Sequence, residues 1–255
     1  MDTQFSDLVR PVLAPNPGPM TLDGTNSYLL GRPDELVVVD PGPDDAGHLD
    51  ALAAAGRVAL ILITHHHADH TAGIPGLRER TGAPVRAFDP AYCHDAEPLV
   101  DGEIIEVDGV SIRVLATPGH TADSLSFVVE ADGKVGVLTG DTILGRGTTV
   151  LMNDDGSLAA YLDSLDRLEA IGPVTVLPAH GPELPDLVAV CQALREHRHE
   201  RLQQIREALQ QLSTDAASAE VASVTDLVYA DVDPAVRFAA EASVATQLAY
   251  LREHP

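Results

Sequence analysis

Residues 64–70, with the sequence THHHADH, concentrate side chains that bind metal ions. The segment places four histidines and one aspartate directly after the apolar run 59–63. Imidazole nitrogens and carboxylate oxygens are ordinary ligands of zinc and of other transition metals. A histidine-rich tract can also be an expression tag or a loose metal binder. Because this tract is internal, contains an acid and follows a run typical of a buried strand, we interpret it as a metal site.

The spacing within the tract predicts how its side chains divide between two metal ions. Alternate side chains of an extended segment point the same way, so His65 and His67 can reach one ion while His66 points elsewhere. Asp69 and His70 are adjacent and cannot share one face of a strand. If the chain turns into a helix at this point, both can face a second ion beside the first.

Three further apolar runs end in residues that can bind metal. The motif TPGHT contains His120, TGDT contains Asp141 and PAHGP contains His180. A glycine beside each lets the backbone turn sharply and approach a ligand closely. Taken singly, each of these side chains is more often structural than ligating. Sites in α/β sheets gather at the carboxyl ends of strands, so the four strand ends together predict one converging metal site.

The composition is that of a globular protein with a large excess of acid. The chain has 255 residues, of which 45% are hydrophobic and 22% charged, and its net charge is −23. The simplest interpretation of this charge is solubility. It also repels polyanions and argues against general affinity for nucleic acid, so we expect a small-molecule substrate and disfavour RNA as a partner.

Cysteine usage and hydropathy indicate a cytoplasmic protein. Cys93 and Cys191 are the only cysteines and form no CxxC motif, so a disulfide framework is not expected. The N-terminal residues lack a basic start followed by an apolar run, and we expect no signal peptide. No apolar stretch reaches the length of about 18 residues that crosses a membrane.

Hydrophobic periodicity and turn residues predict two regions of different character. After a Pro/Gly-rich opening loop, strands are expected over residues 28–30, 36–40, 58–63, 84–88, 103–107, 110–116, 124–130, 134–139 and 174–177. Helices are expected over residues 44–55, 71–80, 157–170, 187–212, 217–229 and 234–253. Because no strand is expected after the last apolar run, we place a domain boundary near Pro185, between a mixed domain at 1–185 and a helical unit at 186–255. The short connection after His180 should hold this unit beside the metal site.

The four motifs resemble, in the same order, the metal-ligand motifs of the metallo-β-lactamase superfamily, over roughly the first 185 residues. The resemblance implies an α+β fold, an αββα sandwich with a dinuclear metal site at one edge. The ligands that it implies are His65, His67 and His120 for the first zinc ion, Asp69, His70 and His180 for the second, and Asp141 as a bridge. It gives His66 no ligand role, because that position of the motif is variable.

The implied site has a defined chemistry. Nitrogen and carboxylate ligands suit two zinc ions, with iron or manganese as alternatives. Two ions about 3.5 to 4 Å apart lower the pKa of a shared water toward about 7, so that a metal-bridging hydroxide forms at neutral pH. Asp69 is the expected catalytic residue, because it can orient this water or transfer its proton.

Finer sequence features resemble one subgroup of the superfamily. The segments DGTNSYLLG at 23–31, GDTILGRGTT at 140–149 and REHRHER at 195–201 are similar to the lactamase-beta-like subgroup, which includes an animal mitochondrial endoribonuclease. The resemblance implies a C-terminal winged-helix-like unit. No β-wing is expected after the third helix, which weakens the expectation that this unit binds nucleic acid.

Several functions are compatible with these residues. The favoured one is a dinuclear zinc hydrolase acting on a small ester, thioester or phosphodiester. The alternatives are a single-strand-specific endoribonuclease and, in another class, an iron-dependent sulfur oxidoreductase of the same fold. A flavin-partnered enzyme is disfavoured because no flavin domain is expected after residue 185, and an antibiotic lactamase because no export signal is expected. A non-catalytic metal-stabilised module is disfavoured because every ligand position is filled.

Overall fold

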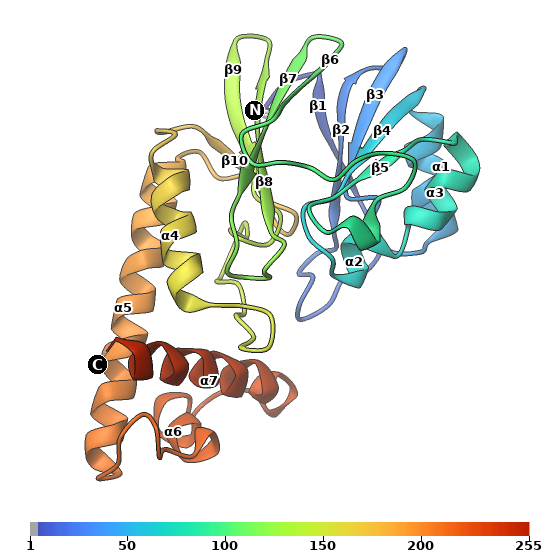
Figure 1. Cartoon of the computed structure of the whole chain (residues 1–255). Coiled ribbons are helices and arrows are strands. Elements are labelled where there is room, and N and C mark those ends of the chain that lie inside the picture. The colour runs from blue at the N-terminus through green and yellow to red at the C-terminus, as the bar shows by residue number, and fades with distance from the viewer. Residues whose placement is uncertain (1–4, 255) are drawn as a thin grey trace.

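Two five-stranded sheets form the centre of the computed structural model, which describes residues 5–254 (Figure 1). The first sheet has the order β1-β2-β3-β4-β5, with the strands Val9–Leu13, Asn26–Arg32, Glu35–Val39, Val58–Leu62 and Val85–Arg86. The second has the order β10-β9-β8-β7-β6, with the strands Thr175–Leu177, Lys134–Leu138, Leu125–Ala131, Val110–Ala116 and Ile104–Val107. Both sheets are mixed, because each joins antiparallel neighbours to at least one parallel pair.

Two hairpins of the second sheet join neighbouring strands that the sequence predicts, 103–107 to 110–116 and 124–130 to 134–139. The turn at Asp108 and Gly109 joins β6 to β7, and the turn at Asp132 and Gly133 joins β8 to β9. Asp132 and Gly133 have φ angles of 53° and 71°. Two successive residues with positive φ are what a two-residue hairpin turn requires.

Helices cover the outer face of each sheet, and they fall into two sets. The helices α1, α2 and α3, at Ala46–Ala54, Ala68–Thr71 and Ile74–Thr81, lie on the side of the first sheet (Figure 1). The helices α4 and α5, at Leu158–Glu169 and Leu187–Gln211, lie on the side of the second. The remaining helices are α6 at Val221–Val228, α7 at Arg237–Glu253 and the 3-10 turns Pro90–Tyr92 and Pro234–Val236.

The core between the sheets defines the layers. Val39 and Leu62 of the first sheet and Ile112 and Phe127 of the second belong to one buried cluster. Separate clusters join the first sheet to α1 and α3, and the second sheet to α4 and α5. These three clusters confirm the expected αββα sandwich with a C-terminal helical region.

Hydrophobic packing continues from the sandwich into the C-terminal helices. Leu165 of α4, Leu202 and Ile205 of α5, and Leu248 of α7 belong to one buried cluster. The domain boundary near Pro185 therefore stays a prediction from the sequence. Within residues 178–254 no strand follows β10, so the described part of this region contains helices and no β-wing.

The structure differs from the predicted elements at two places near the site. Strand β1 lies in the segment that was expected to be a loop, and it accommodates Pro11 because it is an edge strand. The expected helix 71–80 is instead two helices, α2 and α3, separated at Gly73. A Cβ atom at Gly73 would lie 2.8 Å from the carbonyl oxygen of Pro41, so only glycine fits where α2 meets the loop after β3.

Candidate metal centre

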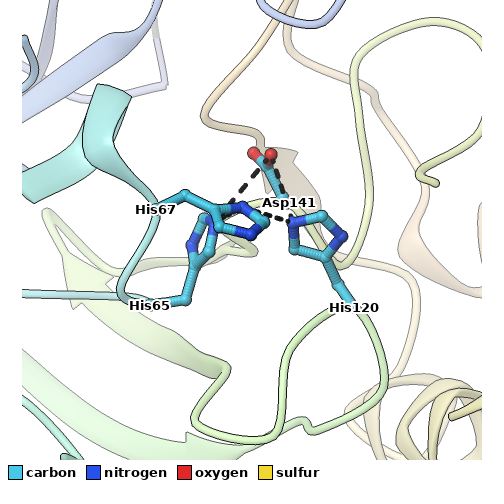
Figure 2. Close-up of side chains that lie close together, drawn as sticks. All are labelled: His65, His67, His120 and Asp141. Carbon is cyan, nitrogen blue, oxygen red and sulfur yellow. Dashed lines mark hydrogen bonds and ion pairs between the residues drawn. The ribbon is translucent and has the colours of Figure 1, made fainter. Parts of the chain in front are cut away.

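Four of the predicted ligands form a first group at the edge of the sandwich. His65 and His67 follow β4, His120 follows β7 and Asp141 follows β9 (Figure 2). Nδ1 of His67 lies 3.1 Å from Nε2 of His65 and 3.1 Å from Nε2 of His120. Oδ2 of Asp141 lies 3.6 Å from Nε2 of His120 and 4.0 Å from Nε2 of His65.

The other three predicted ligands form a second group beside the first. Asp69 and His70 lie on the short helix α2, and His180 follows β10. Oδ2 of Asp69 lies 3.1 Å from Nε2 of His180 and 3.3 Å from Nε2 of His70. Oδ1 of Asp141 lies 3.3 Å from Nε2 of His180 and 3.5 Å from Nε2 of His70. Asp141 therefore lies between the groups and presents one carboxylate oxygen to each.

The donor atoms fit a pair of metal ions. Nε2 of His70, Nε2 of His180 and Oδ1 of Asp141 are buried and, among residues 5–254, have no hydrogen-bond partner. Buried polar atoms of this kind are costly unless a ligand satisfies them. Ligand atoms about 2.0 to 2.1 Å from a tetrahedral zinc ion lie about 3.3 Å from one another, which is close to the separations in both groups. The two groups are a metal-binding cluster typical of a dinuclear site.

Four of the histidines are oriented by a hydrogen bond at Nδ1. The acceptors are Thr64 Oγ1 for His65 at 3.0 Å, Asp40 Oδ2 for His70 at 2.8 Å, the Val150 carbonyl for His120 at 2.9 Å and the Gly24 carbonyl for His180 at 3.0 Å. When Nδ1 donates, the lone pair of Nε2 is free to bind a metal ion. In each of these histidines Nε2 is the atom that faces the other ligands.

Asp40 is a further residue of the site, although the sequence predicts it only as the end of the strand 36–40. It is 1% exposed, and its carboxylate also accepts hydrogen bonds from the backbone and hydroxyl of Thr64 at 2.8 and 2.7 Å. Asp40 therefore orients His70 directly and His65 through Thr64, which is one histidine of each group. The signal was present, because Asp40 ends an apolar run as the predicted ligands do.

Two close approaches explain glycines beside the ligands. A Cβ atom at Gly119 would lie 2.4 Å from Cα of Tyr161, so glycine lets α4 pack against the turn that carries His120. A Cβ atom at Gly140 would lie 2.9 Å from the side chain of Thr64. Gly140 also has a φ of 49°, in the left-handed region that glycine tolerates best.

The two ligand groups differ in protonation. Burial, followed by the charge of neighbouring histidines, lowers the pKa of His67 to about 4, and the pKa of His65 is lowered for the same reasons. Both rings are therefore neutral ligands at pH 7. Burial lowers the pKa values of His70 and His180, but the neighbouring aspartates raise them by more, that of His180 to about 9, so a metal ion in the second group would displace protons from these rings. Burial raises the pKa values of Asp69 and Asp141, but His70 and His180 lower them by more. The net pKa of each carboxyl group lies below its ordinary value, so both carboxylates stay ionised.

His66 lies outside both groups, as the resemblance implied. Its Nδ1 lies 2.9 Å from Oδ1 of Asp123, and its Nε2 lies 3.5 Å from Oδ2 of Asp155. The two aspartates hold the ring at the wall of the cavity that opens onto the ligands. Neither Asp123 nor Asp155 was identified from the sequence, because each follows no apolar run that would mark it.

A cavity of about 210 Å³, here called the metal pocket, gives access to the centre. Its lining residues are Met20, His66, His67, Asp69, His120, Asp141, Val150, Met152, Asp154 and Asp155. Met20, Val150 and Met152 give it an apolar wall, and Asp154 and Asp155 add acids outside the two groups described above. Asp155 also lies with His66 and Asp123 in a third set of side chains close enough together to hold a metal ion.

Comparison with known proteins shows the same family along most of the chain. Residues 20–180 match the model of the metallo-beta-lactamase superfamily. Beta-lactamase-like protein 2 homolog from Caenorhabditis elegans is 34% identical in an alignment 252 residues long that covers 93% of this chain and 81% of the relative. An atrochrysone carboxyl ACP thioesterase from Aspergillus fumigatus is 32% identical in an alignment 220 residues long that covers 83% of this chain and 68% of the relative.

A solved structure has a similar fold over the whole chain. A metallo-beta-lactamase family protein from Thermus thermophilus superposes with a TM-score of 0.80 at 23% identity, covering 97% of this chain and 94% of the other. The sandwich and its two groups of histidines and aspartates define a metal-dependent hydrolase. The chain belongs to the metallo-β-lactamase superfamily. Within residues 5–254 no helix is long and apolar enough to cross a membrane.

Proposed function

We propose that this chain hydrolyses thioesters at a dinuclear zinc centre. The observation that carries the proposal is the lining of the metal pocket, which combines an apolar wall with two carboxylates outside the ligand groups. An acyl chain can pack against Met20, Val150 and Met152. Asp154 and Asp155 would repel the phosphate of a phosphodiester at the same place. Similarity to a protein named as an ACP thioesterase supports the same choice.

The ligand chemistry supports zinc. The donor atoms of both groups are imidazole nitrogens and carboxylate oxygens, which zinc accepts in four-coordinate sites, although iron and manganese accept them too. When bound, such ions would lower the pKa of a water molecule toward about 7 and would polarise a carbonyl oxygen. We propose His65, His67 and His120 as ligands of the first ion, Asp69, His70 and His180 as ligands of the second, and Asp141 as their bridge.

Asp69 is the residue that we propose to handle the proton. It lines the metal pocket, its side chain is 27% exposed, and Thr25 Oγ1 donates to its Oδ2 at 3.3 Å. Because its carboxylate stays ionised, it can accept a hydrogen bond from the attacking water and then the proton that the water loses. The proton can pass from there to the departing thiolate, while the apolar wall limits access of bulk water.

The second candidate function is single-strand-specific endoribonuclease activity. It follows from the resemblance to the lactamase-beta-like subgroup, and the alignment with beta-lactamase-like protein 2 homolog extends over 93% of the chain, into the helical region. Against it stand the net charge of −23 and the acids of the metal pocket. The iron-dependent sulfur oxidoreductase is the alternative from another class, and the metal content of the purified protein separates it from both hydrolases.

One substrate panel tests the proposal. The zinc-loaded protein is assayed on an acyl thioester, a phosphodiester model compound and a single-stranded RNA oligonucleotide, with the His67→Ala variant as the control. We expect thioester hydrolysis to exceed the other two activities and to be lost in the variant. Salt-sensitive RNA cleavage that depends on His67, without thioester hydrolysis, would overturn the proposal and favour the endoribonuclease.

A further inference from the structure

A second cavity of about 210 Å³, here called the cationic pocket, lies between α5, α7 and the segment 148–150. Its lining residues are Thr148, Thr149, Val150, His197, Arg198, Arg201, Tyr229, Val232, Val236, Ala239, Ala240 and Ser243. Two arginines are therefore present without any acidic lining residue. The lining therefore carries the opposite sign of charge to the chain as a whole, whose net charge is −23.

The two arginines lack the carboxylate partners that occupy their neighbour. Arg195, one turn earlier on α5, forms ion pairs with Asp166 and Glu169 at 2.6 Å. Within residues 5–254, neither Arg198 nor Arg201 forms an ion pair. Their guanidinium groups lie over aromatic rings instead, with Arg198 5.0 Å from the ring centre of Tyr161 and Arg201 4.8 Å from that of Tyr229.

Arg198 retains hydrogen-bonding capacity in a buried position. It is 3% exposed, and its Nη2 donates to the carbonyl oxygen of Thr149 at 2.7 Å. Its Nε is buried and has no hydrogen-bond partner among the described residues. A buried guanidinium without a counter-ion is costly, and an anion in the pocket would offset that cost.

The other polar residues that line the pocket include His197 and Ser243. Burial, and then the charges of Arg198 and Arg201, lowers the pKa of His197, while Glu200 acts in the opposite direction. His197 is therefore neutral at pH 7 and supplies a hydrogen-bonding group. Ser243 on α7 lines the same pocket as the arginines on α5.

The cationic pocket adjoins the metal pocket. Val150 lines both cavities. Thr149 connects them as well, because its carbonyl accepts the hydrogen bond from Arg198 and its Oγ1 lies 2.9 Å from Nδ1 of His120. The segment 148–150 is therefore a wall that the two cavities share.

We infer that the cationic pocket binds the phosphate group on the carrier arm of a thioester substrate whose acyl group lies in the metal pocket. This inference rests on the proposed function for the identity of the ligand. The planar guanidinium offers paired donors that match phosphate geometry, and hydrogen bonds to an anion are stronger than neutral ones. The carboxylates of Asp154 and Asp155 in the metal pocket and the arginines of the cationic pocket would then orient the substrate. Its neutral thioester would lie toward the metal ions and its anionic phosphate away from them.

A binding experiment tests the pocket without hydrolysis. Calorimetry on the zinc-loaded protein compares 4′-phosphopantetheine with pantetheine, which lacks the phosphate. The variant is Arg201→Gln, and the matched control is Arg206→Gln, an exposed arginine of the same helix that does not line the pocket. We expect wild type and the control to bind the phosphorylated compound about tenfold or more tightly than pantetheine, and the Arg201 variant to lose this preference.

Two further binding measurements identify the kind of phosphate group that the cationic pocket binds. Inorganic phosphate should compete with 4′-phosphopantetheine in wild type and not in the Arg201 variant. Equal binding of the two pantetheine compounds by wild type, or an unchanged preference in the Arg201 variant, would overturn the inference. Arg201-dependent binding of a single-stranded RNA oligonucleotide without binding of 4′-phosphopantetheine would also overturn it, and would identify the anion as a nucleic-acid backbone.

Kinetics distinguishes failure of this inference from failure of the proposed function. With an acyl-4′-phosphopantetheine substrate, Arg201→Gln should raise KM about tenfold, and with an acyl-N-acetylcysteamine substrate it should leave KM and kcat unchanged. If wild type hydrolyses neither thioester, the proposed function fails. The calorimetric preference for 4′-phosphopantetheine over pantetheine still tests whether the cationic pocket binds phosphate. An equal effect of the variant on both substrates would contradict the inference.

Discussion

Oδ2 of Asp40 lies 2.8 Å from Nδ1 of His70, so a buried carboxylate outside both ligand groups fixes which nitrogen of that histidine faces the metal centre. The same oxygen accepts a hydrogen bond from the hydroxyl of Thr64, which in turn lies 3.0 Å from Nδ1 of His65. One aspartate thus orients a histidine in each group. The geometry of the centre therefore depends on a residue that belongs to neither ligand group.

Replacing Asp40 by asparagine tests this dependence. The amide group would face the donors of Thr64 and His70 with its own N–H, so at least one of these hydrogen bonds would be lost. We expect the affinity for zinc to fall about 10- to 100-fold, as measured by competition with a chromophoric chelator. Asp34→Asn, at an exposed position, is the control. Unchanged affinity in the Asp40 variant would show that the ligands hold their orientation without it.

Asp141→Ala tests the bridge between the groups. Its two oxygens face different groups, Oδ1 toward His70 and His180 and Oδ2 toward His65 and His120. Removing both oxygens should leave the fold intact and release at least one metal ion per chain, which mass spectrometry of the intact protein and elemental analysis would measure. Two ions retained at full occupancy, with unchanged activity, would contradict the bridging role.

The convergence of the candidate ligands was predictable because they lie at the ends of buried strands. His120 and Asp141 are far apart in the chain, yet each follows an apolar run, and the carboxyl ends of such strands meet at one edge. Asp123 and Asp155 carry no such signal, since they lie in loops whose positions depend on how the helices pack. The hydrogen bond from Arg198 to the carbonyl oxygen of Thr149 could not be predicted from the sequence for the same reason, because it joins α5 to a loop that is distant in the chain.

The fold shows the same division between local and non-local information. The strands of the two hairpins with Asp-Gly turns were predicted from local residues, and at Asp132 and Gly133 both turn residues have positive φ. Strand β1 was not predicted, since its pairing with β2 depends on contacts that the sequence VRPVL does not specify. Gly73 lies between α2 and α3 and against the loop after β3, and this packing is a tertiary effect as well.

Cys191 should make the stability of the protein depend on alkaline pH. Burial raises the pKa of this thiol from 9.0 to about 12. The folded state therefore keeps a proton that the unfolded state loses, and the free energy of unfolding should fall as the pH rises from about 9 to about 12. Urea unfolding at pH 8 and pH 10 should show a smaller loss of stability for Cys191→Ala than for wild type. Parallel losses in the two proteins would contradict this role of Cys191.

Adjacent histidines provide the sharpest comparison within the centre. His67 contributes Nδ1 to the first group, 3.1 Å from Nε2 of both His65 and His120, whereas His66 turns away and bonds to Asp123. We therefore expect His67→Ala to lose at least one metal ion per chain and His66→Ala to retain both.

Because His66 also lines the metal pocket, its removal should raise KM for a thioester severalfold while the metal content stays at two. Metal analysis and steady-state kinetics on the same two preparations measure both effects. Loss of an ion from the His66 variant would contradict this assignment. It would mean that His66 takes part in the metal centre and is not only a residue of the cavity wall.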